Sequence, residues 1–114
     1  MIVGIGIDIV DMNRFNKIAE NKKFREKYFT ENESLLNALS LAGRFASREA
    51  LYKAVGSQKL FDWEDVEIIN IDSGAPKFIF RNSAAKFFKS KKIHLSISHA
   101  PEYAISVVII EAIV

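Results

Sequence analysis

The start of the chain alternates between bulky apolar side chains and small or polar ones. One face of residues 2–10 carries Val3, Ile5, Ile7 and Ile9. The other face carries Gly4, Gly6 and Asp8. A period of two residues predicts a β-strand. A dinucleotide-binding fingerprint would need a third glycine at position 9, where Ile9 stands, so that class of site is excluded.

Helical spacing follows this strand. Asp11 is a suitable N-cap for a helix. The apolar side of that helix is expected to hold Met12, Phe15, Ile18 and Ala19. Residues 30–33 (Thr-Glu-Asn-Glu) match a capping box and predict a second, short helix that carries Leu35, Leu36 and Leu39. A longer helix is expected at about 41–55, with Gly56 as its C-terminal stop.

The second half of the chain returns to a period of two. Strands are predicted at 66–72, 77–81, 93–98 and 103 to about 110. The first two flank a turn at 72–76, and Asn82 is a suitable N-cap for a helix after them. The last strand is apolar on both faces, which predicts a central position in its sheet. The pattern predicts one α+β domain over 1–114, with a small, mostly antiparallel sheet packed with helices.

Composition narrows the function classes. The chain has 114 residues, fewer than the ~150 of an average domain, which leaves no room for a second one. The hydrophobic fraction of 49% and charged fraction of 26% exclude a disordered chain. With no cysteine, disulfides, thiolate zinc sites and cysteine nucleophiles are excluded. The N-terminus has no basic leader, and the C-terminal apolar run is too short to span a membrane.

Positive charge is concentrated in one stretch. The net charge of +2 is too small to indicate nucleic acid binding by itself. Between residues 14 and 28, however, the chain has six basic side chains and only two acidic ones. The basic side chains are Arg14, Lys17, Lys22, Lys23, Arg25 and Lys27. Such a stretch is either a solvated helix face or a docking surface for an acidic partner.

Two carboxylates are candidates for a metal site. Asp8 lies in an otherwise apolar strand, where a carboxylate is costly unless it is paired or binds a cation. Glu49 and Lys53 lie four residues apart on one helical face. A hard cation such as Mg²⁺ uses one or two carboxylates together with waters and substrate phosphates. The structural alternatives are a cap or salt bridge for Asp8 and an exposed ion pair for Glu49 and Lys53.

The segment 96–99 adds two hydroxyls and a histidine. Ser98 and His99 are neighbours in an extended chain, so their side chains point to opposite faces and cannot form a nucleophile–base pair. His99 is either a surface histidine in a turn or a contact for a phosphate.

Three segments taken together resemble a known family. They are Gly4–Val10, Gly43–Ala54 and Ser96–Ala104. In order, spacing and chain length they are similar to the holo-acyl-carrier-protein synthases, the small single-domain branch of the 4′-phosphopantetheinyl transferases. The resemblance covers nearly the whole chain. It implies the phosphopantetheinyl transferase fold, a cytoplasmic location, and transfer of 4′-phosphopantetheine from coenzyme A to a serine of apo acyl carrier protein, releasing adenosine 3′,5′-bisphosphate.

The resemblance also implies roles for particular residues. Asp8 and Glu49 would be Mg²⁺ ligands, and Lys53 a cation that contacts phosphate. The serine proton would go to Glu49 or to a water held by the metal. Arg44 and His99 would contact the nucleotide phosphates. The turn containing Gly74 and Pro76 would line the adenine.

The family pattern is not matched everywhere. Ala75 replaces a lysine usual in the adenine turn. The segment 56–58 (Gly-Ser-Gln) replaces a Gly-Thr-Gly, and Arg48 stands where lysine is frequent.

The resemblance also implies a docking surface: the first helix, with Arg14 and its basic neighbours Lys17 and Arg25, would dock the carrier. The resemblance further implies a homotrimer with active sites at the subunit boundaries.

Other functions remain open on the residues alone. A non-enzymatic basic module that binds an acidic protein or RNA would use residues 14–27 and a second cluster, namely Lys86, Lys89, Lys91 and Lys92. That interpretation leaves Asp8 and the Glu49–Lys53 pair without a role. A magnesium-dependent nucleotide hydrolase would use the same carboxylates. The broad-specificity transferase branch has two such units, and this chain is too short for them.

Overall fold

The computed structural model describes residues 1–56 and 60–113. The strands are β1 (Ile2–Asp11), β2 (Val66–Asn70), β3 (Pro76–Phe80), β4 (Lys91–His99) and β5 (Tyr103–Ala112). The helices are α1 (Met12–Ala19), α2 (Lys22–Tyr28), α3 (Glu31–Ser34), α4 (Ala38–Ala54) and α5 (Asn82–Phe87), with a 3₁₀ turn η1 at Trp63–Asp65. The fold is therefore α+β, as the sequence predicts.

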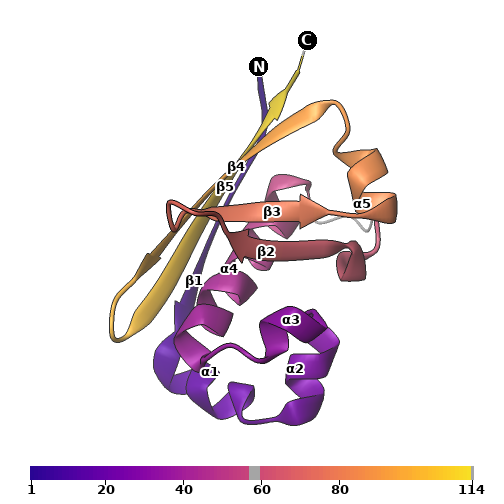
Figure 1. The fold of residues 1–114 in the computed structure, drawn as a ribbon. Helices are drawn as coiled ribbons and strands as arrows, with labels where there is room; N and C mark the ends of the chain where they lie inside the picture. The colour runs from indigo at the N-terminus through magenta and orange to yellow at the C-terminus, as the bar shows by residue number, and fades with distance from the viewer. Residues whose placement is uncertain (57–59, 114) are drawn as a thin grey trace.

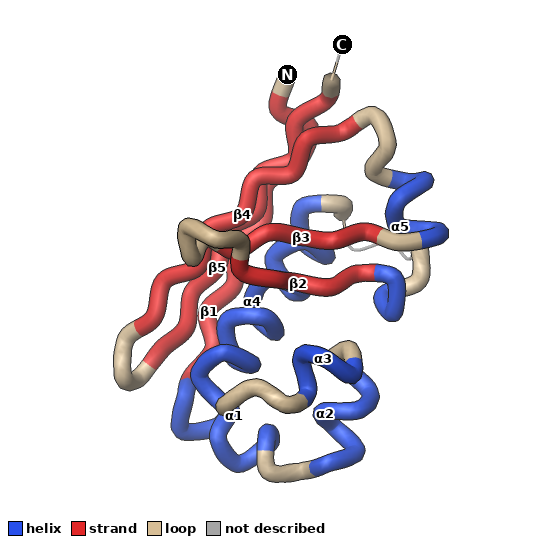
Figure 2. Tube along the Cα trace, in the orientation of Figure 1, coloured by secondary structure: helices blue, strands red, loops and turns tan. Residues whose placement is uncertain are grey.

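The strands form two antiparallel sheets. One has the order β1-β5-β4, so the strand that is apolar on both faces is central, as predicted. The other is the β2–β3 hairpin. Helix α4 lies between the three-stranded sheet and the hairpin, while α1, α2 and α3 gather at one end of the molecule (Figure 1). Figure 2 shows the same layers and places both termini at the opposite end.

Helix α4 approaches β1 very closely because both surfaces carry small residues. Ala46, Ala50 and Ala54 recur every four residues on the helix and are buried. A Cβ built on Gly6 would lie 1.8 Å from the carbonyl oxygen of Ala50, and one on Gly4 would lie 2.2 Å from that of Ala54. Only glycine fits at these positions of β1. This contact fixes the position of β1 along α4 and so places Asp8 beside the helix.

The described residues 1–56 and 60–113 do not cover the other face of the three-stranded sheet. Val3, Ile5, Ile7 and Ile9 are each more than half exposed there. Ile7 pairs with Val107 and Ile9 with Ile105 on β5, which continues the apolar surface across the sheet. We call this surface, made by alternate residues of β1 and β5, the open sheet face.

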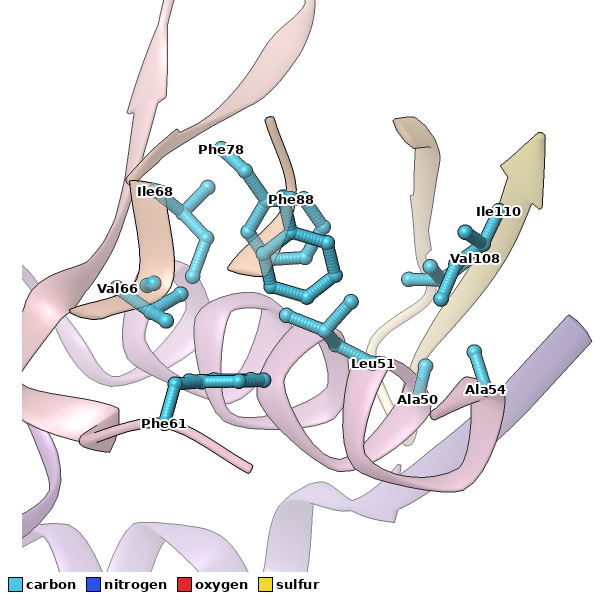
Figure 3. Close-up of a cluster of buried hydrophobic side chains, with 11 residues drawn as sticks. Ala50, Leu51, Ala54, Phe61, Val66, Ile68, Phe78, Phe88, Val108 and Ile110 are labelled. Atoms are coloured by element: carbon cyan, nitrogen blue, oxygen red, sulfur yellow. The ribbon is translucent and has the colours of Figure 1, made fainter. Parts of the chain in front are cut away.

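Two hydrophobic clusters hold the elements together. The first joins α4 to the hairpin, α5 and β5 through Leu51, Phe61, Ile68, Phe88 and Val108, among others (Figure 3). The second joins α1 and the start of α4, and includes Val10, Phe15, Phe29 and Leu41. Both clusters use α4, so this helix is the element that positions everything around it.

Most of the helix caps and stops predicted from the sequence are confirmed. The Asp11 side chain accepts a hydrogen bond from the backbone N–H of Asn13 at 2.8 Å and caps α1. Thr30 and Glu33 form the reciprocal capping box of α3. Gly56 follows the end of α4 with φ of +88°, a conformation that favours glycine. The Ser57 and Gln58 departures lie outside the described residues.

Other boundaries differ from the prediction. Helix α2 was not predicted; its N-cap is Asn21, whose side chain accepts from the N–H of Phe24 at 3.2 Å. Helix α3 ends at Ser34, and α4 begins at Ala38, three residues before the predicted start, with Asn37 as its N-cap. Leu35 is therefore exposed rather than helical. Asn82 is not the N-cap, which is Arg81: it is the first residue of α5, with φ of +46°, and its side-chain amide donates to Asp65.

Strand ends move by smaller amounts. The strand predicted at 66–72 stops at Asn70, because Ile71 and Gly74 close the hairpin turn by backbone hydrogen bonds. The strand predicted at 93–98 extends to Lys91–His99. Within the described part of the chain, no helix is both long and apolar enough to cross a membrane.

Candidate active site

A lysine and two carboxylates meet where α4 crosses β1. The ammonium group of Lys53 donates to Asp8 Oδ1 at 3.1 Å and to the carbonyl oxygen of Ile7 at 2.9 Å. The side chain of Asp8 is 16% exposed and that of Lys53 is 50% exposed, so the pair lies at the rim of the helix–strand contact. The salt bridge that was the structural alternative for Asp8 is therefore present, with Lys53 as its partner.

Glu49 lies one helical turn before Lys53 and shares this site. Its pKa is raised above the usual range, first because the side chain is partly buried and second because of the negative charge of Asp8. The positive charge of Lys53 opposes that rise. A carboxylate pair with this mutual repulsion is stabilised by any cation that binds between the two groups.

The donor set at this point fits Mg²⁺. Asp8 and Glu49 provide two carboxylates, and no third His, Cys, Asp or Glu joins them within residues 1–56 and 60–113. Magnesium is commonly held in proteins by one or two carboxylates, with waters and substrate phosphates completing its shell. The two carboxylates and the adjacent ammonium form a suitable place for a metal-bound phosphate group.

Arg44 is held between α4 and the β2–β3 hairpin. Its Nε donates to the carbonyl oxygen of Ile68 at 3.3 Å, and its Nη2 donates to Asn70 Oδ1 at 3.1 Å. Burial lowers its pKa from the usual value. Asn70 in turn donates to the carbonyl oxygen of Gly74 at 3.3 Å. Arg44 is thereby linked to the turn that contains Gly74 and Pro76.

His99 lies beside the first half of α4. A Cβ built on Gly43 would be only 2.8 Å from His99 Nε2, so the imidazole packs against the helix next to Arg44. Ser98 and His99 are consecutive residues of β4, opposite Ile105 and Ala104 of β5, and so point to opposite faces, as predicted.

The candidate residues thus form two groups in one chain. The first group, which we call the metal group, is Asp8, Glu49 and Lys53. The second, the nucleotide group, is Arg44, Gly74, Pro76 and His99. Asp8 and His99 lie on the two outer strands of the sheet, with β5 between them. Two strand spacings separate outer strands by about 10 Å, so Asp8 and His99 of one chain do not meet at a single point.

Arg48 forms a buried ion pair with Glu33 that the sequence analysis did not predict. It is 8% exposed and donates to both carboxylate oxygens of Glu33 and to the carbonyl oxygen of Val66. Glu33, 2% exposed, also accepts from the backbone N–H of Ile68 at 2.9 Å. This buried pair ties α3, α4 and β2 together. The capping box pointed to Glu33 as a helix cap only.

The basic stretch covers α1 and α2. Arg14 and Lys17 are exposed on α1. Arg25 is half-buried, and its guanidinium donates to the carbonyl oxygen of Ala19 at the end of α1. Because α1 follows directly after β1, these side chains lie near the strand that carries Asp8. Among the residues described, the side chains of Arg14 and Lys17 make no hydrogen bond of this kind, whereas that of Arg25 stabilises the contact between α1 and α2.

Known proteins resemble the chain over almost its whole length. Residues 4–108 match the family model of the 4′-phosphopantetheinyl transferase superfamily. A holo-[acyl-carrier-protein] synthase of Oceanobacillus iheyensis is 43% identical, over 97% of this chain and 98% of that protein.

Solved structures agree with the sequence comparison. A holo-(acyl-carrier-protein) synthase of Bacillus anthracis, solved in complex with coenzyme A (3′,5′-ADP), is 40% identical and covers 98% of both chains with a TM-score of 0.82. That of Helicobacter pylori, solved in complex with coenzyme A, is 32% identical, with a TM-score of 0.82 over 94% of this chain and 99% of that one. These matches favour an enzyme over the basic binding module.

Proposed function

Because this chain belongs to the 4′-phosphopantetheinyl transferase superfamily, we propose that it transfers 4′-phosphopantetheine from coenzyme A to a serine of apo acyl carrier protein. In this proposal Mg²⁺ is required and adenosine 3′,5′-bisphosphate is released. The observation that carries the proposal is the meeting of Asp8, Glu49 and Lys53 where α4 crosses β1. Coenzyme A bound to the Bacillus anthracis and Helicobacter pylori relatives supports it as the donor.

The residues of the metal group have separate tasks in this reaction. Asp8 and Glu49 would hold Mg²⁺, which when bound neutralises charge on the pyrophosphate oxygens of the donor. The serine oxygen of the carrier forms a bond to the phosphorus next to the pantetheine, and the bond from that phosphorus to the bridging oxygen breaks. Glu49, or a water held by the metal, would accept the serine proton. Lys53 compensates the charge that develops on the departing nucleotide, as positioned cations do in other phosphoryl transfers.

The nucleotide group would hold the other end of the donor. Arg44 and His99 carry groups suited to phosphate, and the turn containing Gly74 and Pro76 lies beside Arg44 through Asn70. Since Arg44 already bonds to the hairpin, a phosphate there would meet a guanidinium that is fixed in place rather than a mobile one. Preorganised cations of this kind lose little entropy on binding.

We also propose that the protein is a homotrimer whose active sites form between subunits. Two observations support this. Asp8 of the metal group and His99 of the nucleotide group lie on opposite outer strands of one chain. The open sheet face leaves four apolar side chains of β1 more than half exposed, which is typical of a surface that meets another protein. A neighbouring subunit would cover that face and supply the nucleotide group to the metal group of the first.

The basic side chains of α1 would dock the carrier. The proposed partner is an acidic carrier protein, and Arg14 and Lys17 are exposed close to the strand that carries Asp8. Opposite charges on the two surfaces would steer the carrier toward the site and make association fall with salt.

The test follows both substrates at once. Purified protein is incubated with coenzyme A, Mg²⁺ and apo carrier; the carrier is weighed by mass spectrometry and the nucleotide is separated by chromatography. The proposal predicts one phosphopantetheine group added to the carrier for each adenosine 3′,5′-bisphosphate formed. Nucleotide formed while the carrier mass stays unchanged would instead indicate the hydrolase. If neither substrate changes, the proposal is wrong.

A further inference from the structure

Asn70 joins two members of the nucleotide group without being one of them. It is the last residue of β2, lies opposite Pro76 of β3 and is exposed. Its Oδ1 accepts a hydrogen bond from Arg44 Nη2 at 3.1 Å, and its Nδ2 donates to the carbonyl oxygen of Gly74 at 3.3 Å. One side chain therefore connects the guanidinium on α4 to the turn at the end of the hairpin. We call this pair of hydrogen bonds the Asn70 bridge.

A side-chain amide suits both ends of this bridge. A guanidinium only donates hydrogen bonds and a carbonyl oxygen only accepts them, so the bridging group needs an acceptor at one end and a donor at the other. The reversed amide would place N–H groups against the guanidinium and oxygen against oxygen. A carboxylate of the same shape would keep the acceptor for Arg44 but lose the donor for Gly74. Asparagine is thus matched to the two groups that it connects.

The bridge leaves part of the donor capacity of Arg44 for a ligand. Its Nε donates to the carbonyl oxygen of Ile68 at 3.3 Å, and its Nη1 donates to that of Ser40 at 3.5 Å. Each terminal nitrogen carries a second N–H group, and within residues 1–56 and 60–113 these two have no hydrogen-bond partner. Two N–H groups on one planar guanidinium can bind a phosphate bidentately.

The bridge also leaves the charge of Arg44 available. Oε2 of Glu33 lies 3.9 Å from Arg44 Nε, beyond hydrogen-bond distance, and both carboxylate oxygens of Glu33 accept from Arg48. The groups that accept from Arg44 are two carbonyl oxygens and an amide oxygen, all of them neutral. A carboxylate at position 70 would instead neutralise the guanidinium and repel a phosphate beside it.

We propose that Asn70 is a positioning residue for nucleotide binding, which orients the Arg44 guanidinium toward a phosphate and fixes it relative to the turn containing Gly74. This inference rests on the proposed function. Asn70 acts through Arg44 rather than by touching the donor. Because the guanidinium is already held in place, binding a phosphate costs less side-chain entropy than it would with a mobile arginine. The effect belongs to donor binding, and the chemical step at the metal group does not depend on it.

Binding of adenosine 3′,5′-bisphosphate tests this role without requiring transfer. The whole protein is titrated with this nucleotide by calorimetry, and the steady-state constants for transfer are measured separately. Asn70 is exposed, so its variants are expected to fold, which circular dichroism checks. Asn70→Ala should raise the dissociation constant of the nucleotide and the KM for coenzyme A by about tenfold, with kcat and the KM for the carrier unchanged.

Two further variants separate charge and local structure from this effect. Asn70→Asp should weaken nucleotide binding more than Asn70→Ala, because it adds a negative charge beside the phosphate. Ile69→Thr is the matched control. Ile69 precedes Asn70 on β2, is 36% exposed and points to the other face of the hairpin, so all of these constants should stay as in the wild type.

A double-mutant cycle shows whether Asn70 acts through Arg44. Arg44→Met removes the guanidinium but keeps an unbranched apolar side chain between α4 and the hairpin. Asn70→Ala should weaken nucleotide binding by about tenfold in the wild type but by less than about threefold in Arg44→Met, because the group that it positions is gone. The same loss in both backgrounds, or no loss in the wild type, would overturn the inference.

The outcomes separate this inference from the proposed function, since carrier modification is measured independently. A protein that modifies the carrier but shows no coupling between Asn70 and Arg44 contradicts the positioning role alone. A protein that shows the coupling but fails to modify the carrier supports the positioning role and contradicts the transferase. A wild type that does not bind the nucleotide contradicts both.

Discussion

Replacing Gly6 by alanine tests whether the helix–strand contact positions the site. The added Cβ would lie 1.8 Å from the carbonyl oxygen of Ala50, whereas ordinary contacts begin at 3.4 Å, so β1 and α4 would have to separate locally by roughly 1.6 Å. Both contacting groups are backbone, so no side chain can rotate away. Overpacking of this kind costs about 1–3 kcal/mol, and we expect Gly6→Ala to reach about 3 kcal/mol in the free energy of unfolding.

The same shift would move Asp8 away from Glu49 and Lys53. A misplacement of about 1 Å can cost roughly 100-fold in rate, so we expect kcat for transfer to fall by about that factor. Urea unfolding measures the stability, and the carrier-modification rate measures kcat.

The control for this substitution is Gly56→Ala. Gly56 has φ of +88° but nothing within 4 Å of an added Cβ, so it should lose only about 1 kcal/mol and keep its transfer rate. If Gly6→Ala matches Gly56→Ala in stability and transfers at the wild-type rate, the close contact does not position the metal group.

Four further substitutions, with one control, test other parts of the account. Asp8→Ala and Glu49→Ala should each abolish transfer but retain the fold by circular dichroism, and near-normal turnover at saturating Mg²⁺ would remove that residue from the metal site. Arg14→Glu should raise the KM for the carrier far more than the KM for coenzyme A. The control, Lys86→Glu at an exposed lysine of α5, should change neither KM. If Arg14→Glu changes both KM values equally, the basic side chains of α1 form only a solvated helix face. Ile7→Lys on the open sheet face should shift sedimentation equilibrium from trimer to monomer and lower activity, whereas a wild-type monomer with full activity would refute the shared site.

Much of the fold could be predicted because its signals are local. The Asp11 and Thr30 caps and the Gly56 stop depend on neighbouring residues only, and each is present in the structure. The central position of β5 followed from its apolar residues on both faces. Helix α2 escaped prediction because its seven residues are mostly charged. Its place depends on Phe24, which meets Phe15 and Phe45 with ring centroids 6.0 Å away in each case.

The candidate site divides in the same way. The carboxylate of Asp8 in an apolar strand indicated that it needs a partner, and the family resemblance grouped it with Glu49 and Lys53. The structure places these three side chains near one another. Sequence reasoning did not find that Arg48 pairs with Glu33, since that contact joins two helices whose packing no local pattern specifies.

The Asn70 bridge could not be predicted either. The sequence analysis named Arg44 and Gly74 but gave Asn70 no role, because the three residues come from α4, the hairpin turn and β2. Only the packing of the hairpin against α4 brings these groups together. Features that depend on one segment were therefore accessible from the sequence, and features that depend on the meeting of several segments were not.

The intact mass of apo acyl carrier protein tests the central claim most directly. The carrier is incubated with coenzyme A and Mg²⁺, in parallel with the wild-type protein and with Glu49→Gln, which keeps the size of the side chain but removes its charge. The account predicts that the carrier gains one phosphopantetheine group with the wild type and keeps its original mass with Glu49→Gln. An unmodified carrier with the wild type, or equal modification by both proteins, would contradict it.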